Sequence, residues 1–400
     1  MNVPILSSLP ARVRAALAYM SVFAAVGSML QFMPLYYRSL GFSLGEIGSI
    51  LGLGALVSLL AAPSWGALSD RRRGSPLVLL AAAATSLNGT GLLAAATETV
   101  SVILGAAVLG AGMAGLSPIV DARALETAGA NRSGYGPLRA WGSVSYIGAI
   151  LVTGVAVDAW GPRSLFAVLA TMLVVTAIVG LALRPALSDR PLHTAARPLR
   201  DAGRLFGPRG MGMFLLGAFL TSLGMSAILA FTPIRFQELG ADAKVVGLSG
   251  AIAAGLEVPI MLRFPQLAAR FGSDRLLIAG AVLMAARSVV AALAPDASML
   301  LASSIFGGFG FALFFIGGVT YVSRHVPAEL AATAQGIFQG VGSTLSQVVA
   351  AAGGGVLAAS VGVAGLFATG AGFGIVGATI IAYAVRRGAT QPSAVAVEAT

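Results

Sequence analysis

Long apolar stretches, separated by short polar segments, run through the whole chain. Each stretch has about 20 residues or more, which is enough for a helix to cross a hydrocarbon layer about 30 Å thick. The pattern therefore predicts twelve membrane-spanning helices, approximately over residues 13–37, 44–67, 76–97, 101–124, 135–157, 163–183, 210–236, 245–264, 275–294, 298–322, 331–358 and 362–385.

The composition supports this pattern and excludes a soluble protein. Hydrophobic residues make up 57% of the chain and charged residues only 10%, so most of the molecular surface must face lipid. The 52 glycines are typical of helices that pack closely in a membrane. With no cysteine, the chain has no disulfide or thiol chemistry. The predicted fold class is an all-α membrane protein.

The basic residues predict the orientation, because cytoplasmic loops retain Lys and Arg. With both termini on the cytoplasmic side of a bacterial inner membrane, most of the 25 basic residues lie on the inner side. Arg71, Arg123 and Arg324 are among these inner charges. The net charge of +10 is thus a topology signal. The arginines are scattered over many loops instead of forming one face, which argues against a nucleic-acid partner.

A sequence repeat divides the chain into two halves. Phe32-Met33-Pro34 with Leu40-Gly41 recurs as Phe231-Thr232-Pro233 with Leu239-Gly240, about half the chain length later. In an all-helical membrane protein, such a repeat predicts two six-helix bundles of the same topology. We expect bundles over residues 1–184 and 210–400, joined by a cytoplasmic linker over 185–209.

A charged loop follows the second span, in the segment Gly66-Ala67-Leu68-Ser69-Asp70-Arg71. In this topological position it resembles the loop between helices two and three of the major facilitator superfamily, which implies that fold. We expect Gly66 to permit a tight turn and Asp70 to lie near the N-terminus of the third helix. Paired with Arg71, this loop would act as a gate on the cytoplasmic side. The alternative is that the arginines only set the topology.

The fourth and fifth spans carry a closer resemblance. Residues 117–122 and 135–146 resemble the lactose permease and phenylpropionate permease branch of the superfamily. That resemblance implies that Asp121, Arg139 and Tyr146 contact the substrate. From the residues alone, Asp121 and Arg139 could form an inter-helix pair, bind a polar substrate, or be two solvated charges at helix ends.

A second charged pair lies deeper in the membrane. Glu257 and Arg287 fall near the middle of spans eight and nine, where an unpaired charge costs at least roughly 2.5 to 3.5 kcal/mol. We predict that Glu257 carries a coupling proton and that Arg287 stabilises the ionised carboxylate. A structural ion pair is the alternative. The resemblance breaks at Gly307 and Gly310, where the lactose permease has a His and a Glu. Symport therefore rests on Glu257, and facilitated diffusion stays open.

Polar or aromatic residues within apolar helices predict the lining of a substrate cavity. Candidates in the first half are Gln31, Tyr36 and Tyr19. In the second half, Gln339 and Ser343 are four residues apart, which places them on one face of an α-helix together with Gln347. A sugar, a nucleoside, or an aromatic or other organic acid would fit such a lining.

These observations predict a secondary transporter that moves a small organic solute by alternating access, with proton symport. We expect a monomer in the bilayer, with the solute and the proton as partners. No nucleotide loop, metal cluster or nucleophile is evident in the sequence, so neither a cofactor nor enzymatic activity is expected. The alternatives are a proton-driven exporter of drugs or metabolites and a membrane sensor that does not transport.

Overall fold

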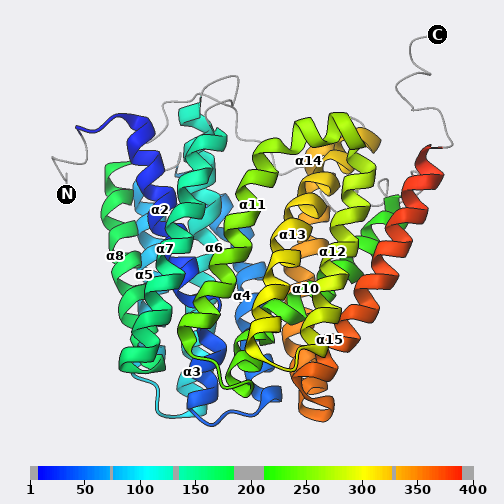
Figure 1. The fold of residues 1–400 in the computed structure, drawn as a ribbon. Coiled ribbons are helices and arrows are strands. Elements are labelled where there is room, and N and C mark those ends of the chain that lie inside the picture. The colour runs from blue at the N-terminus through cyan, green and yellow to red at the C-terminus, as the bar shows by residue number, and fades with distance from the viewer. Residues whose placement is uncertain (1–7, 73–74, 129–134, 184–210, 327–329, 390–400) are drawn as a thin grey trace. The chain divides into compact units, whose positions relative to one another are not determined.

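The structure is a computed structural model that describes residues 8–72, 75–128, 135–183, 211–326 and 330–389. All regular secondary structure in these ranges is helical (Figure 1). The helices of the first half are α2 (Ala11–Met29), α3 (Met33–Ser39), α4 (Leu44–Arg71), α5 (Pro76–Ala94), α6 (Thr99–Ala128), α7 (Tyr135–Trp160), η1 (Pro162–Ser164) and α8 (Leu165–Ala182). Those of the second half are α10 (Met211–Glu238), α11 (Ala243–Phe271), α12 (Ser273–Leu293), α13 (Ala297–His325), α14 (Ala331–Gln339), the π-helix η3 (Gly340–Leu345) and α15 (Ser346–Ala389).

The helices confirm the predicted all-α membrane fold. Within the described ranges, eleven segments are long and apolar enough to span a membrane. The last of these, Ala334–Arg387, has 54 residues, or about 80 Å of helix, and so is long enough to cross twice. Gly362, whose φ is +75°, divides it at the point where the sequence separates spans eleven and twelve. The twelve predicted spans are therefore all accounted for.

The glycines of the sequence repeat end helices α3 and α10 in the same way. Gly41 and Gly240 both have positive φ, +87° and +73°. In each case the next residue closes the helix end. Phe42 N–H donates to the Tyr37 carbonyl at 3.3 Å, and Ala241 N–H to the Phe236 carbonyl at 2.9 Å. This is the Schellman arrangement, which favours glycine because other residues are strained there.

The two copies of the repeat differ at their prolines. The first span is interrupted at residues 30–32, between α2 and α3, and Pro34 lies in the first turn of α3, where its missing N–H is tolerated. By contrast, α10 continues through Pro233. A shared sequence motif thus gives a broken helix in one half and an unbroken helix in the other.

The contacts divide the described residues into two compact units. The first contains the residues up to 183 together with 232–254, and the second contains 211–231, 255–326 and 330–389. The C-terminal end of α10 and the first part of α11 therefore pack with the first unit. The bundle limits at 184 and 210 stay a prediction, and the linker over 185–209 lies outside the described residues.

Each unit has its own apolar core. In the first, α2 packs on α6, α7 and α8, while α5 packs on α6 and α8. In the second, α12 packs on α13 and α15. Phe214 lies at the centre of this second core, with its ring centroid 4.4 Å from that of Tyr321 and 5.6 Å from that of Phe338.

The charged loop differs from the sequence expectation. Helix α4 continues to Arg71, so the expectation of a tight turn at Gly66 is wrong, as is the placement of Asp70 near the N-terminus of the third helix. Asp70 lies exposed in the last turn of α4, the end of a helix that disfavours a carboxylate. The physical reason is that one glycine costs a helix only about 1 kcal/mol, which the flanking helix formers offset. The gating role of Gly66, Asp70 and Arg71 stays a prediction.

The glycine at the end of α3 gives a first test. Gly41→Ala should lower the free energy of unfolding by about 1 to 2 kcal/mol, because the alanine Cβ is strained at positive φ. Gly45→Ala is the matched control, since Gly45 is helical and a Cβ there has no neighbour within 4 Å. Thermal unfolding of both variants in detergent measures the difference. Equal midpoints would contradict the assigned role of Gly41.

Candidate functional site

The carboxylate of Asp121 is held by a tyrosine from another helix. Asp121 lies half-buried in α6 and accepts a hydrogen bond from the hydroxyl of Tyr19, a fully buried residue of α2. Arg139, the partner suggested by sequence, belongs to α7, but its side chain lies outside the described residues. The pairing of Asp121 with Arg139 therefore stays a prediction. The Tyr19 hydroxyl thereby fixes the orientation of the Asp121 carboxylate.

Arg123 follows Asp121 in α6 and is buried, with 7% of its surface exposed. It lies within α6, as the predicted span 101–124 expects, and α6 extends beyond it to Ala128. Its location on the inner side stays a prediction. A buried arginine beside a candidate substrate residue is a further candidate for the site. In the sequence, the feature that could have identified Arg123 as a site residue is its position within an apolar stretch.

Two predicted aromatic residues support the packing of the first unit. Tyr36 is fully buried, donates a hydrogen bond to the Leu93 carbonyl at 2.5 Å, and meets the ring of Phe166 edge-on at 4.7 Å. Tyr146 is half-buried beside Gly27 of α2, where a Cβ would lie 2.7 Å from the Tyr146 carbonyl oxygen. Both residues hold helices together in this structure. Their contact with a substrate stays a prediction.

Gln31 combines burial with an unsatisfied polar atom. It lies in the break between α2 and α3 with 5% of its surface exposed, and its Oε1 accepts no hydrogen bond from any described residue. The side chain fits there because Gly250 of α11 has none, since a Cβ at Gly250 would lie 2.6 Å from Nε2 of Gln31. A buried acceptor without a donor costs about 1 to 3 kcal/mol, which a bound hydroxyl or amine would recover.

Helices α7 and α11 are joined within the first unit by Asp158. Its carboxylate accepts hydrogen bonds from the backbone N–H groups of Ala243, at 2.7 Å, and Lys244, at 3.0 Å. These are orphan donors at the N-terminus of α11, where a carboxylate is favoured. A Cβ at Gly154 would lie 2.9 Å from the Ala243 carbonyl oxygen, so the helices touch backbone to backbone.

Asp158 is not evident from the sequence as a functional residue, because nothing in the linear order relates it to a helix start about 85 residues later. The sequence shows only that Asp158 is an acidic residue at the end of an apolar span. Its capping role depends entirely on tertiary contact.

Among the predicted charged residues whose side chains the structure describes, Arg287 is the most deeply buried. It has 3% of its surface exposed in α12, and its Nη1 donates a long hydrogen bond to the sulfur of Met225 at 3.7 Å. Gly307 of α13 makes room for it, because a Cβ there would lie 2.3 Å from Nη1. One of the two residues at which the lactose permease resemblance breaks, Gly307, therefore accommodates this arginine.

Glu257 lies half-buried in α11, in the same compact unit as Arg287. An ion pair between the two, and a proton on Glu257, stay predictions.

The predicted polar face of span eleven has a different geometry. The π-helix Gly340–Leu345 lies between Gln339 and Gln347 and changes the helical phase, so the α-helical spacing used to place them on one face with Ser343 does not hold. Gln339 and Gln347 are exposed, and Ser343 is half-buried. π-Turns occur frequently at functional sites, so this segment remains a candidate.

Membrane-length helices that carry a half-buried carboxylate, a buried arginine and a buried amide are typical of a multi-pass membrane transporter. Comparison with known families agrees. The profile described as the MFS_1 like family matches residues 13–369, and the chain belongs to this family.

Several bacterial membrane transport proteins are similar to the chain. The maltose permease of Geobacillus stearothermophilus is 27% identical, over 82% of this chain and 83% of the permease. The probable 3-phenylpropionic acid transporter of Escherichia coli is 26% identical, over 67% of this chain and 70% of that protein. The multidrug resistance protein MdtG of Citrobacter koseri is 25% identical, over 65% and 66%. The predicted resemblance to the phenylpropionate permease branch is confirmed.

The fold has solved counterparts. The crystal structure of the nucleoside transporter NupG superposes with a TM-score of 0.79, at 18% identity, over 94% of this chain and 99% of that one. At this identity the likeness establishes the fold alone. Transport is therefore the activity of the family, while the solute and its coupling require separate arguments.

The space beside Arg287 gives a second test. Gly307→Ala should lower the free energy of unfolding by about 1 to 3 kcal/mol, because the new methyl group overlaps the guanidinium. Gly255→Ala in α11 is the control, since a Cβ there has no neighbour within 4 Å. Thermal unfolding in detergent compares the two. A Gly307→Ala midpoint equal to that of the control would show that the arginine is not packed against this glycine.

Proposed function

We propose that this protein is a secondary active transporter of the bacterial inner membrane that takes up a small hydroxyl-bearing solute by proton symport. The observation that carries the proposal is the burial of Arg287 inside a membrane-spanning helix, with 3% of its surface exposed. Such a charge costs several kcal/mol of folding energy unless it is compensated, so its presence favours a functional role. The family supports transport by alternating access.

Coupling is proposed to run through Glu257. A protonated Glu257 is neutral and can be buried in an apolar environment at little energetic cost. The ionised form is stable there only if the positive charge of Arg287 compensates it. Binding and release of the proton would therefore change the strength of their attraction. This change would favour different conformations before and after the solute is released.

The polar groups of the first unit favour a solute that donates hydrogen bonds. The Oε1 of Gln31, which accepts no hydrogen bond from any described residue, and the carboxylate of Asp121 are both acceptors. A hydroxyl group of a sugar or nucleoside would donate to the Gln31 oxygen, whereas the ionised carboxylate of an aromatic acid would not. Arg139, Gln339 and Ser343 are proposed to add further contacts.

We propose that access to the solute site is controlled by contacts at the outer and the inner ends of the helices. Asp158 would hold α7 on α11 at the outer side while the inner side is open. Asp70 and Arg71 would act at the inner side. Both termini are proposed to lie in the cytoplasm, because the positive-inside rule applied to the arginines favours that orientation. A monomer is sufficient for this cycle.

The second candidate function is proton-driven export of drugs or metabolites. The similarity to a protein named multidrug resistance protein MdtG favours it. The same two charged residues would then couple inward proton flow to outward solute flow.

The coupling role predicts a loss of current in Glu257→Gln. In proteoliposomes on a solid-supported membrane, sugars or nucleosides should evoke a current in the wild type and none in Glu257→Gln, which cannot release a proton. Glu98→Gln, a change at an exposed residue before α6, should keep the current. An unchanged current in Glu257→Gln would remove it as the proton carrier. If wild type and variant are both silent, and an outward assay with drugs is positive, the exporter is favoured.

The contact between α7 and α11 predicts a more accessible α11 in Asp158→Ala, which removes both acceptor oxygens. The chain has no cysteine, so Ser249→Cys, at a position in α11 with 1% of its surface exposed, adds a single reporter thiol. Loss of the helix cap should raise the rate of maleimide labelling by roughly 2- to 30-fold. Asp296→Ala is the control, because Asp296 caps α13 in the other unit through the Met299 N–H at 2.8 Å. Equal labelling rates in both variants would rule out a gating contact at Asp158.

A further inference from the structure

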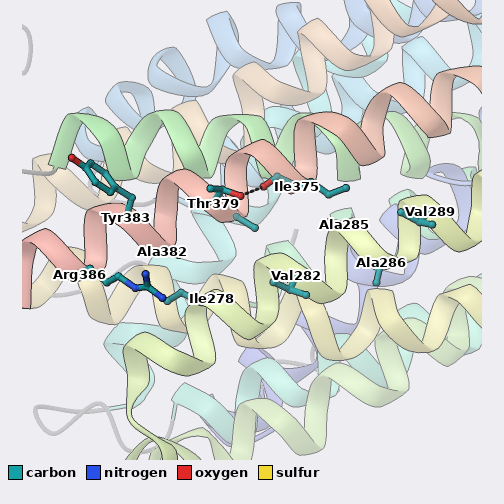
Figure 2. Close-up of a pocket in the computed structure, with 11 residues that line it drawn as sticks. Ile278, Val282, Ala285, Ala286, Val289, Ile375, Thr379, Ala382, Tyr383 and Arg386 are labelled. Atoms are coloured by element: carbon teal, nitrogen blue, oxygen red, sulfur yellow. Dashed lines mark hydrogen bonds between the residues drawn. The ribbon is translucent and has the colours of Figure 1, made fainter.

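A groove lies between α12 and α15 in the second unit, away from the residues considered above. Figure 2 shows its lining, with Ile278 and Arg386 toward one end and Val289 toward the other. Its volume is about 620 Å³. Except for Thr379 and the residues at the Arg386 end, the lining is aliphatic. The hydroxyl of Thr379 is already satisfied, because it donates to the Ile375 carbonyl at 2.8 Å.

The groove opens toward the surroundings of the helices. Val282 and Ile375 are 52% and 54% exposed on its rims, while Ala285 and Ala378 are buried at its floor. Both helices belong to candidate membrane spans, so the exposed side faces lipid. Within the membrane an apolar groove of this kind is filled by hydrocarbon.

The length of the groove matches one leaflet of a bilayer. From Ile278 to Val289, α12 rises about 16 Å, and half of the hydrocarbon core is about 15 Å. An acyl chain that begins at the Arg386 end would therefore extend to the middle of the membrane. Small side chains along the groove, such as Ala286 and Ala382, leave room for such a chain.

The Arg386 end carries positive charge. Arg386 is exposed in the last turn of α15 and makes no hydrogen bond or ion pair with residues 211–326 or 330–389. The guanidinium of the neighbouring Arg387 lies 4.8 Å from the centre of the ring of Tyr383, another residue at this end. An arginine beside an apolar groove suits a phosphate group, because guanidinium binds phosphate oxygens bidentately.

We propose that this groove binds an anionic phospholipid, with one acyl chain between α12 and α15 and the phosphate on Arg386. Positive charge at the membrane surface favours an anionic over a zwitterionic headgroup. The site is distinct from the proposed solute and proton sites. Two other occupants, a zwitterionic lipid and a second copy of this chain, are separated by the test below.

Native mass spectrometry of the purified full-length protein tests the proposal with phosphatidylglycerol and phosphatidylcholine that carry the same acyl chains. The wild type should retain phosphatidylglycerol preferentially. Arg386→Gln should lower its apparent affinity about five-fold and leave phosphatidylcholine unchanged. Arg12→Gln is the matched control, because Arg12 is an exposed arginine at the start of α2 in the other unit, and it should behave as the wild type.

Filling the groove tests the acyl chain separately from the charge. Ala382→Phe should reduce retention of both lipids. Ala286→Phe, which fills the groove from α12, provides a second reading if the first variant does not fold. Equal losses in Arg386→Gln and Arg12→Gln, or unchanged retention in the filled variants, would overturn the proposal. So would a dimeric wild type that the phenylalanine variants convert to monomers without loss of lipid.

Discussion

The absence of water in the hydrocarbon core is the constraint on which the rest of this structure depends. Backbone N–H and C=O groups there must be satisfied within the chain, which requires helices wherever it crosses. The same constraint makes every buried polar side chain expensive. Tyr19 with Asp121, Gln31 and Arg287 are therefore exceptions that the fold must accommodate.

Glycines on neighbouring helices provide the space for two of these buried polar side chains. Gly307 leaves the space that the guanidinium of Arg287 occupies, and Gly250 leaves the space for the amide of Gln31. In a close-packed interior even one methyl group at these positions would displace the polar group. A glycine on one helix thus fixes the position of a functional candidate on another.

Helix α12 connects two of the proposals. It buries Arg287 on one side, while its neighbour Ala286 lines the groove proposed for lipid. Since successive residues of a helix point in directions about 100° apart, a lipid and a coupling residue would meet the same helix on different faces. A lipid bound in the groove would then affect the packing of α12 around Arg287 without contacting the guanidinium itself.

The sequence by itself determined the class of fold, the positions of the spans and the repeat, because hydrophobic length and glycine at positive φ are local properties. It also identified Glu257 and Arg287, since a charge within an apolar stretch is visible in one dimension. Only the tertiary structure decided that Tyr19 holds Asp121, that Asp158 caps α11, and that α4 continues past Gly66. These depend on contacts between distant segments or on small differences in helix energy, neither of which a linear pattern records.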